Sequence, residues 1–119
     1  MTQIVLVSHS EKIAQGTKDL LEQMAPGVSV VAIGGHDGGI GTSFDTIFTT
    51  IESLEDDAVC FFDIGSSEMN LDMALEMYAG SHRVEKITAP IVEGSFIAAV
   101  SISTGNDMDA VIQAVNTEF

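Results

Sequence analysis

Two side chains, His9 and Asp63, have the types and positions that phosphoryl transfer requires. His9 follows a short apolar run, residues 4–7, and precedes a helical pattern. An imidazole is a nucleophile or base near neutral pH, and the free N–H groups at a helix N-terminus bind anions. The position of His9 alone supports two interpretations equally well: a residue that accepts a phosphoryl group, or a residue that merely packs at the end of a strand.

Asp63 follows a second apolar run, residues 58–62. A phosphoryl-accepting imidazole is helped if its other nitrogen donates a hydrogen bond to a carboxylate, which fixes the tautomer and stabilises the developing charge. Asp63 is the candidate for this carboxylate, and the alternative is a helix-capping aspartate. Turns and helix N-termini nearby are expected to supply donors for the phosphoryl oxygens. The candidate phosphate-binding residues are Ser10, Gly39, Gly41, Thr42, Gly65, Ser66 and Ser67.

Other chemical signals in the sequence are weak. The glycine-rich segment 34–41 contains neither a P-loop nor a dinucleotide-binding fingerprint. His36 lies in this segment and could line the site, although an exposed loop position explains it as well. His82 follows a helix-ending glycine and is expected to be solvated. Because no metal-ligand spacing occurs, no metal site is expected.

The periodicity of apolar residues predicts an α/β fold. Strand patterns alternate with helical patterns, which is typical of a parallel sheet with helices on both faces. A four-stranded, open, doubly wound sheet in the order 2-1-3-4 is the simplest solution, formed by one domain over residues 1–119. The expected strands are residues 4–7, 28–33, 58–62 and 84–88. This order places the ends of the first and third strands, and therefore His9 and Asp63, at the crevice where such sheets bind ligands.

The ends and faces of the helices can also be predicted. Thr42 or Ser43 is expected to cap the second helix and Ser67 the third, while Pro90 suits the first turn of the fourth. The first helix is expected to bury a stripe at helical spacing. This stripe consists of Ile13, Thr17, Leu20, Leu21 and Met24.

Composition excludes several classes of protein. The formal net charge of -14 argues against nucleic acid as a partner and favours docking to basic protein surfaces. The single cysteine, Cys60, lies in an apolar run, so it is expected to pack in the core. No segment resembles a signal peptide or is long enough to span a bilayer, so we expect a cytoplasmic protein without membrane insertion.

Four segments together resemble the mannose-family IIA domains of the bacterial phosphotransferase system. They are IVLVSHSEKIAQG, GIGTS, FFDIGSSEMN and APIVEGSFIAAVSISTG, and the resemblance runs from residue 3 to about residue 115. Ser-His-Ser and the Ala-Pro-x-Val-Glu-Gly segment favour the branch that contains phosphotransfer subunits of phosphoenolpyruvate-dependent dihydroxyacetone kinases. The resemblance therefore supports His9 as the phosphorylated residue.

The resemblance implies a route for the phosphoryl group. The histidine phosphocarrier protein would phosphorylate His9, and His9 would pass the group to ADP on the nucleotide-binding subunit of the kinase. ADP, ATP and magnesium would then be bound by the partner, with no cofactor on this chain. The resemblance further implies a homodimer. Because the sequence ends at Phe119, we expect the phosphocarrier to be a separate protein.

Three alternatives remain open at this point. A IIA domain of a mannose-type sugar transporter would share the chemistry and differ in the acceptor. A receiver-like regulatory domain would use Asp63 as its phosphorylated residue, but the chain lacks the acidic pair after the first strand that binds magnesium. A flavin-binding module would need a hydroxyl-rich phosphate loop after that strand, which is also absent.

Overall fold

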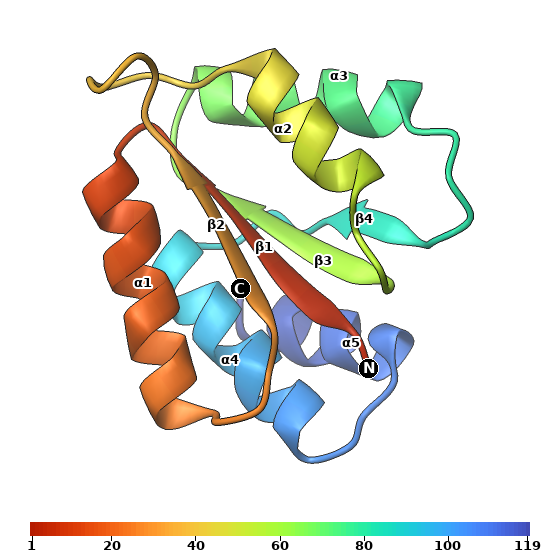
Figure 1. Cartoon of the computed structure of the whole chain (residues 1–119). Helices are drawn as coiled ribbons and strands as arrows, with labels where there is room; N and C mark the ends of the chain where they lie inside the picture. The colour runs from red at the N-terminus through yellow and green to blue at the C-terminus, as the bar shows by residue number, and fades with distance from the viewer.

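The computed structural model describes residues 1–119 and contains a four-stranded parallel sheet with helices on both faces (Figure 1). The strand order is β2-β1-β3-β4, which confirms the prediction from the sequence. The elements are β1 (Gln3–Ser8), α1 (Glu11–Met24), β2 (Val30–Gly34), α2 (Phe44–Glu52), β3 (Ala58–Phe62), α3 (Ser66–Met77), β4 (Val84–Lys86), α4 (Ile91–Ser103) and α5 (Met108–Glu118). None of these helices combines the length and apolarity needed to cross a bilayer.

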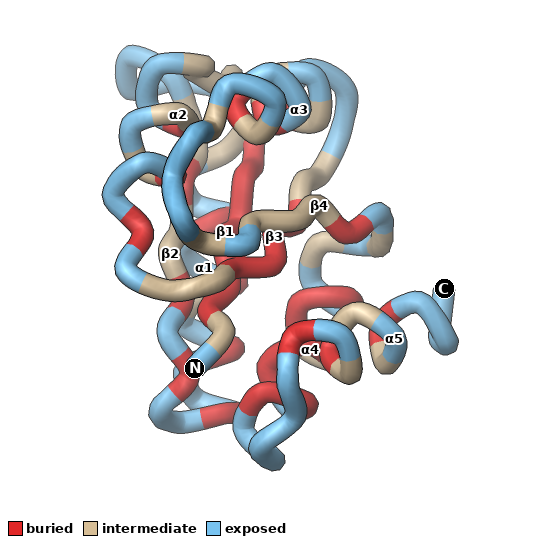
Figure 2. Tube along the Cα trace, turned by 90° about the vertical axis from the view of Figure 1, so that its right-hand side faces the viewer, coloured by how far each residue is buried: buried red, intermediate tan, exposed pale blue.

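The central strand β1 contributes to two cores. Ile4 and Leu6 pack on the face covered by α1, α4 and α5, whereas Val5 and Val7 pack on the face covered by α2 and α3. Side chains alternate along a strand, so a strand covered on both faces needs an unbroken apolar run. Figure 2 shows the resulting buried trace between helices whose outer sides are exposed.

The parallel register determines where the functional residues lie. Val7 pairs with Phe62 across β1 and β3, so both strands end at the same level of the sheet. The residues that follow Val7 and Phe62 in the sequence are therefore neighbours in space. This register places Ser8, His9 and Asp63 together at the carboxyl edge, as the predicted strand order required.

Serine side chains begin two of the helices near this edge. The Ser10 hydroxyl caps α1 by accepting a hydrogen bond from the Ile13 N–H at 3.3 Å. The Ser43 hydroxyl caps α2 by accepting from the Thr46 N–H at 3.4 Å, so the second of the two predicted caps is the one used. Each cap satisfies a backbone donor that the first helical turn leaves free.

Two predicted helix starts were wrong by one or two residues. Gly65, with φ of +48°, precedes α3, and Ser67 lies inside the helix as a fully buried residue. A positive φ favours glycine, and it turns the chain sharply out of β3 into α3. Pro90 is the residue before α4 rather than part of its first turn. Several strand boundaries also differ by one or two residues. β1 is one residue longer than predicted at each end, β2 begins two residues later and ends one residue later, and β4 ends at Lys86 instead of residue 88.

The predicted buried stripe of α1 was partly wrong. Ala14, Thr17 and Leu21 face the sheet, whereas Ile13, Leu20 and Met24 are 47%, 42% and 55% exposed. The start of α1 lies close to β2, because a Cβ added at Gly34 would come within 2.9 Å of the Glu11 Cα. Ile13, Leu20 and Met24 lie on the outer side of the helix.

Candidate phosphoryl-transfer site

His9 and Asp63 form the centre of the site. The His9 Nδ1 and Asp63 Oδ1 atoms are 2.9 Å apart, and the two side chains are 18% and 14% exposed. An ionised carboxylate only accepts hydrogen bonds, so Nδ1 carries the hydrogen, and the neutral imidazole then presents a lone pair at Nε2. This tautomer leaves Nε2 as the nucleophilic nitrogen.

Asp63 is held by five hydrogen bonds. Its Oδ1 accepts from His9 Nδ1, from the Ile64 N–H at 2.7 Å and from the Ser67 hydroxyl at 3.0 Å. Its Oδ2 accepts from the Ser8 hydroxyl at 2.6 Å and from the His9 N–H at 3.0 Å. Burial would raise the pKa of this carboxyl, but these donors, chiefly Ser8 and His9, outweigh burial and hold the pKa well below its usual range. Asp63 is therefore a fixed negative charge beside the imidazole at neutral pH.

Ser66 faces the nucleophilic nitrogen. Its hydroxyl lies 2.8 Å from His9 Nε2 and donates to the lone pair there. Ser66 is exposed, so an incoming group can reach Nε2 once this hydroxyl rotates away. The same hydroxyl is then free to donate to a phosphoryl oxygen.

The N-terminus of α3 offers further donors next to His9. The backbone N–H groups of Gly65 and Ser66 make no hydrogen bond within the chain. Free N–H groups at a helix start bind anions through their hydrogen bonds and the helix dipole. Gly65 and Ser66 are therefore in the predicted place for phosphate binding.

Ser67, by contrast, does not face the reacting nitrogen. Its hydroxyl contacts Asp63 Oδ1 and the Ile64 carbonyl, and its N–H donates to that same carbonyl. The side chain is fully buried because it follows the sharp turn at Gly65 into the helix. Ser67 thus orients Asp63, which is a different role from the predicted phosphate binding.

The glycine-rich loop closes the other side of His9. The Gly41 N–H donates to the His9 carbonyl at 2.8 Å, and the Gly39 N–H donates to the His36 carbonyl at 2.9 Å. Both backbone donors are consequently used to shape the loop and support His9. Thr42 comes directly after the glycine-rich segment and ends the loop. Its hydroxyl accepts a hydrogen bond from Asn70 of α3 at 2.7 Å.

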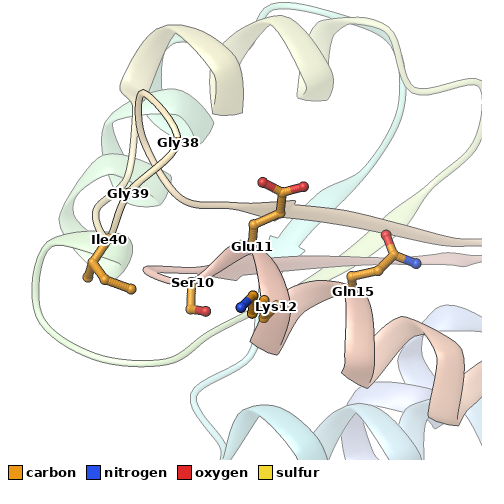
Figure 3. Close-up of a pocket in the computed structure, with 7 residues that line it drawn as sticks. All are labelled: Ser10, Glu11, Lys12, Gln15, Gly38, Gly39 and Ile40. Carbon is orange, nitrogen blue, oxygen red and sulfur yellow. The ribbon is translucent and has the colours of Figure 1, made fainter.

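A cavity of about 540 Å³ lies between this loop and the start of α1 (Figure 3). Ser10 and Lys12 line it together with Gly38, Gly39 and Ile40. Ser10 keeps its hydroxyl hydrogen available, because as a cap it acts only as an acceptor. No three His, Cys, Asp or Glu side chains converge in a way that could hold a metal ion.

The remaining histidines lie apart from Asp63. His36 is 53% exposed and contacts Asp37 at 3.3 Å, and His82 lies 3.6 Å from Asp57. His36 therefore occupies the exposed loop position that the sequence left as an option.

Sequence reasoning missed two polar residues of the site. Ser8 is fully buried and makes the shortest hydrogen bond to Asp63, and Asn70 connects α3 to the glycine-rich loop. Each stands inside a segment that carries the resemblance, Ser-His-Ser or FFDIGSSEMN. A polar residue at the buried end of an apolar strand was the available signal for Ser8.

Comparison with known proteins places this site in a family. The family model for the PTS system fructose IIA component, EIIA-man, matches residues 3–112. The phosphotransferase subunit DhaM of the PTS-dependent dihydroxyacetone kinase of Lactococcus lactis is 41% identical over 110 residues, covering 91% of this chain and 88% of that protein.

Two further similarities support the same assignment. The phosphoryl donor subunit DhaM of PEP-dependent dihydroxyacetone kinase 1 of Listeria innocua is 37% identical, covering 96% of this chain and 92% of that protein. A crystal structure of a protein of unknown function, EF1359, has a TM-score of 0.89 at 27% identity and covers 98% of this chain and 93% of its own. The chain therefore belongs to the EIIA-man family of phosphotransferase-system components.

Proposed function

We propose that His9 carries a phosphoryl group on Nε2, accepting it from the histidine phosphocarrier protein and passing it to ADP on the nucleotide-binding subunit of a dihydroxyacetone kinase. The observation that carries this proposal is the 2.9 Å hydrogen bond between His9 Nδ1 and Asp63 Oδ1. In the neutral imidazole this bond leaves Nε2 as the nitrogen with the lone pair, and it puts a fixed negative charge behind the ring. These are the two properties that a phosphoryl-accepting imidazole needs.

The first transfer converts one phosphohistidine into another. The Nε2 lone pair attacks phosphorus in line, the bond from phosphorus to the carrier's histidine breaks, and Asp63 stabilises the positive charge on the phosphorylated ring. The Ser66 hydroxyl releases Nε2 and donates to a phosphoryl oxygen, joined by the N–H groups of Gly65 and Ser66. In the second transfer an oxygen of the ADP β-phosphate attacks the phosphorus on His9, the Nε2–P bond breaks, and ATP forms on the partner subunit.

The names of the relatives support the kinase as acceptor. Both relatives described above are named as dihydroxyacetone kinase subunits, and one is named a phosphoryl donor. A sugar-transporter IIA role would use the same site chemistry with a different acceptor. The receiver-like hypothesis is set aside, because Asp63 is enclosed by five donors and is largely buried. In our proposal the nucleotide and magnesium stay on the partner subunit.

Charge supports association with basic partner surfaces. The net charge of -14 would steer a partner whose own phosphate site is basic. We expect the association rate with the phosphocarrier to fall as the salt concentration rises, because ions screen exposed charges. Stopped-flow measurements at low and high ionic strength test this, and equal rates would limit the acidic surface to a role in solubility. We also propose that the protein is located in the cytoplasm, where phosphoenolpyruvate and ADP are available.

We also propose that the chain forms a homodimer. The outer side of α1 supports this, since Ile13, Leu20 and Met24 are exposed there and repeat at helical spacing. Light scattering should give twice the chain mass, and Leu20→Glu should shift the population toward monomer. A monomer at micromolar concentration would contradict the proposed homodimer without affecting the chemistry of His9.

A reconstituted relay tests the proposed function. The chain is mixed with phosphoenolpyruvate, the first enzyme of the phosphotransferase system, the phosphocarrier and the other two kinase subunits from Lactococcus lactis. We expect dihydroxyacetone phosphate to form only when the chain is present, and not with His9→Ala. Phosphorylation of a mannose-type IIB domain, with no transfer to the ADP-loaded subunit, would favour the transporter role instead.

A further inference from the structure

Asn70 lies where it can control a hydroxyl of the phosphate site. It follows Ser66 by four residues on α3, so the two side chains lie on one face of the helix. Ser66 contacts His9 Nε2, and Asn70 Nδ2 contacts Thr42 Oγ1 at 2.7 Å. One helix face therefore touches both the reacting nitrogen and the glycine-rich loop.

The direction of the Asn70–Thr42 hydrogen bond determines what Thr42 can do. The Asn70 NH₂ group can only donate, so the Thr42 oxygen accepts and its own hydrogen must point elsewhere. The Thr42 hydroxyl makes no other hydrogen bond in the chain, and the residue is only half-buried. Its hydrogen is therefore available to an external acceptor.

The loop around Thr42 is already anchored beside His9. The preceding residue, Gly41, donates its N–H to the His9 carbonyl at 2.8 Å. The loop is thus fixed at two successive residues, at Gly41 by the backbone and at Thr42 by Asn70. The hydrogen bond to the hydroxyl and the one to the preceding backbone limit the motion of Thr42, and donors fixed in advance in this way stabilise developing charge efficiently.

We propose that Asn70 is a positioning residue that fixes the Thr42 hydroxyl as a donor to the phosphoryl group on His9. This inference rests on the proposed function of His9, and it assigns Asn70 no contact with the phosphoryl group. Removing Asn70 leaves Thr42 free to rotate or to lose its donor direction. The effect of Asn70 must therefore pass entirely through the Thr42 hydroxyl.

A double-mutant cycle with a small phosphoryl donor tests this without any partner protein. Phosphoramidate phosphorylates histidine as the Nε2–P bond forms, the P–N bond to ammonia breaks, and ammonia leaves. We expect Asn70→Ala to slow labelling of His9 by about three- to tenfold and Thr42→Val by about tenfold or more, the scale of one hydrogen bond to a charged group. The double variant should be no slower than Thr42→Val alone, because coupled residues are non-additive.

Further variants separate positioning from a structural effect. Thr42→Ser should keep most of the wild-type rate because it keeps the hydroxyl. Asn70→Asp, which has the same shape, should be slower than Asn70→Ala because its carboxylate accepts the Thr42 hydrogen and repels the phosphoryl oxygens. Asn116→Ala on α5 is the matched control and should label at the wild-type rate. Circular dichroism confirms that each variant is folded.

Two outcomes would overturn the inference. One is a wild-type labelling rate in folded Asn70→Ala, and the other is a double variant whose losses multiply as if the residues were independent. If the proposed function were wrong, the result would be different: phosphoramidate would still label His9, whereas the phosphocarrier protein would not phosphorylate it.

Discussion

Replacing Asp63 by asparagine removes the charge of this side chain with little change of shape. Asparagine has the same shape, and its amide oxygen can replace Oδ1 and accept from His9 Nδ1, the Ile64 N–H and Ser67. The amide NH₂ then faces the Ser8 hydroxyl, which can rotate to accept, and the His9 N–H, which cannot. The imidazole should keep its tautomer, while the negative charge behind it disappears together with the hydrogen bond from the His9 N–H.

The loss can be estimated from the geometry. A hydrogen bond to a charged acceptor contributes about 1.5–3 kcal/mol, compared with about 0.5–1.5 kcal/mol for a neutral pair. The lost attraction between a carboxylate and a charged ring about 4 Å away amounts to roughly 4 kcal/mol at a near-surface dielectric constant. These contributions overlap, so we expect about 3–4 kcal/mol less stabilisation of the transition state. That corresponds to a rate about a hundred to a thousand times lower, at about 1.4 kcal/mol per factor of ten.

Rapid-quench measurement of phosphoryl transfer from the phosphocarrier to Asp63→Asn checks this magnitude. Asp19→Asn, on the exposed side of α1, removes the same charge far from the ring and should transfer within about twofold of wild type. Circular dichroism establishes that both variants are folded. A folded Asp63→Asn protein that transfers within threefold of wild type would refute the electrostatic role and leave Asp63 as a structural residue only.

Three further predictions concern stability and reactivity. The pKa of Asp63 is held below its usual range, so its stabilising contribution should be complete above about pH 5, where an unfolded aspartate is ionised, and should be lost as the pH falls further. Urea unfolding from pH 6 to pH 3 should show a shallower loss of stability for Asp63→Asn than for wild type. Gly16→Ala should raise the free energy of unfolding by about 0.5–1 kcal/mol, because nothing lies within 4 Å of the added Cβ. Gly34→Ala should lower the free energy of unfolding, because its Cβ would approach the Ser10 carbonyl oxygen to 2.5 Å. Equal denaturation midpoints for the two variants would contradict this contrast. Burial raises the pKa of the Cys60 thiol to about 12, so a thiol reagent should label Cys60 only after denaturation. Fast labelling of the native protein would contradict the buried position of this thiol.

The sheet and the central pair were predictable because strong local patterns determine them. An unbroken apolar run at residues 4–7 needs two covered faces, and alternating strands and helices then limit the strand order. Since both strands end at the same edge, the pairing of His9 with Asp63 follows. The fold and the family were therefore accessible from sequence.

The exposed side of α1 was not predictable from side-chain size. Periodicity shows that a helix has an apolar stripe, but Ile13 and Leu20 lie close to the stripe that contains Ala14 and Leu21. Which stripe faces the sheet depends on how closely the two backbones approach. That distance is a tertiary property, which the spacing of apolar residues along the sequence does not determine.

The hydrogen-bond roles around His9 also depend on tertiary structure. Gly41 and Ser67 were expected to bind phosphate, yet Gly41 bonds to the His9 carbonyl and Ser67 to Asp63. Sequence identifies residues that can donate but does not reveal which donors are already used. Asn70 shows the converse, since its amide gains a role only when the loop containing Thr42 lies against α3.

The most direct test of the account is to locate the phosphoryl group. The chain is phosphorylated by phosphoenolpyruvate, the first enzyme and the phosphocarrier, and the imidazole nitrogens are observed by ¹⁵N and ³¹P NMR. We predict a single phosphohistidine, with phosphorus coupled to His9 Nε2, that is absent in His9→Ala and retained in His36→Ala and His82→Ala. Phosphorus on Nδ1, a hydroxylamine-sensitive phosphate on Asp63, or label that persists in His9→Ala would contradict the account.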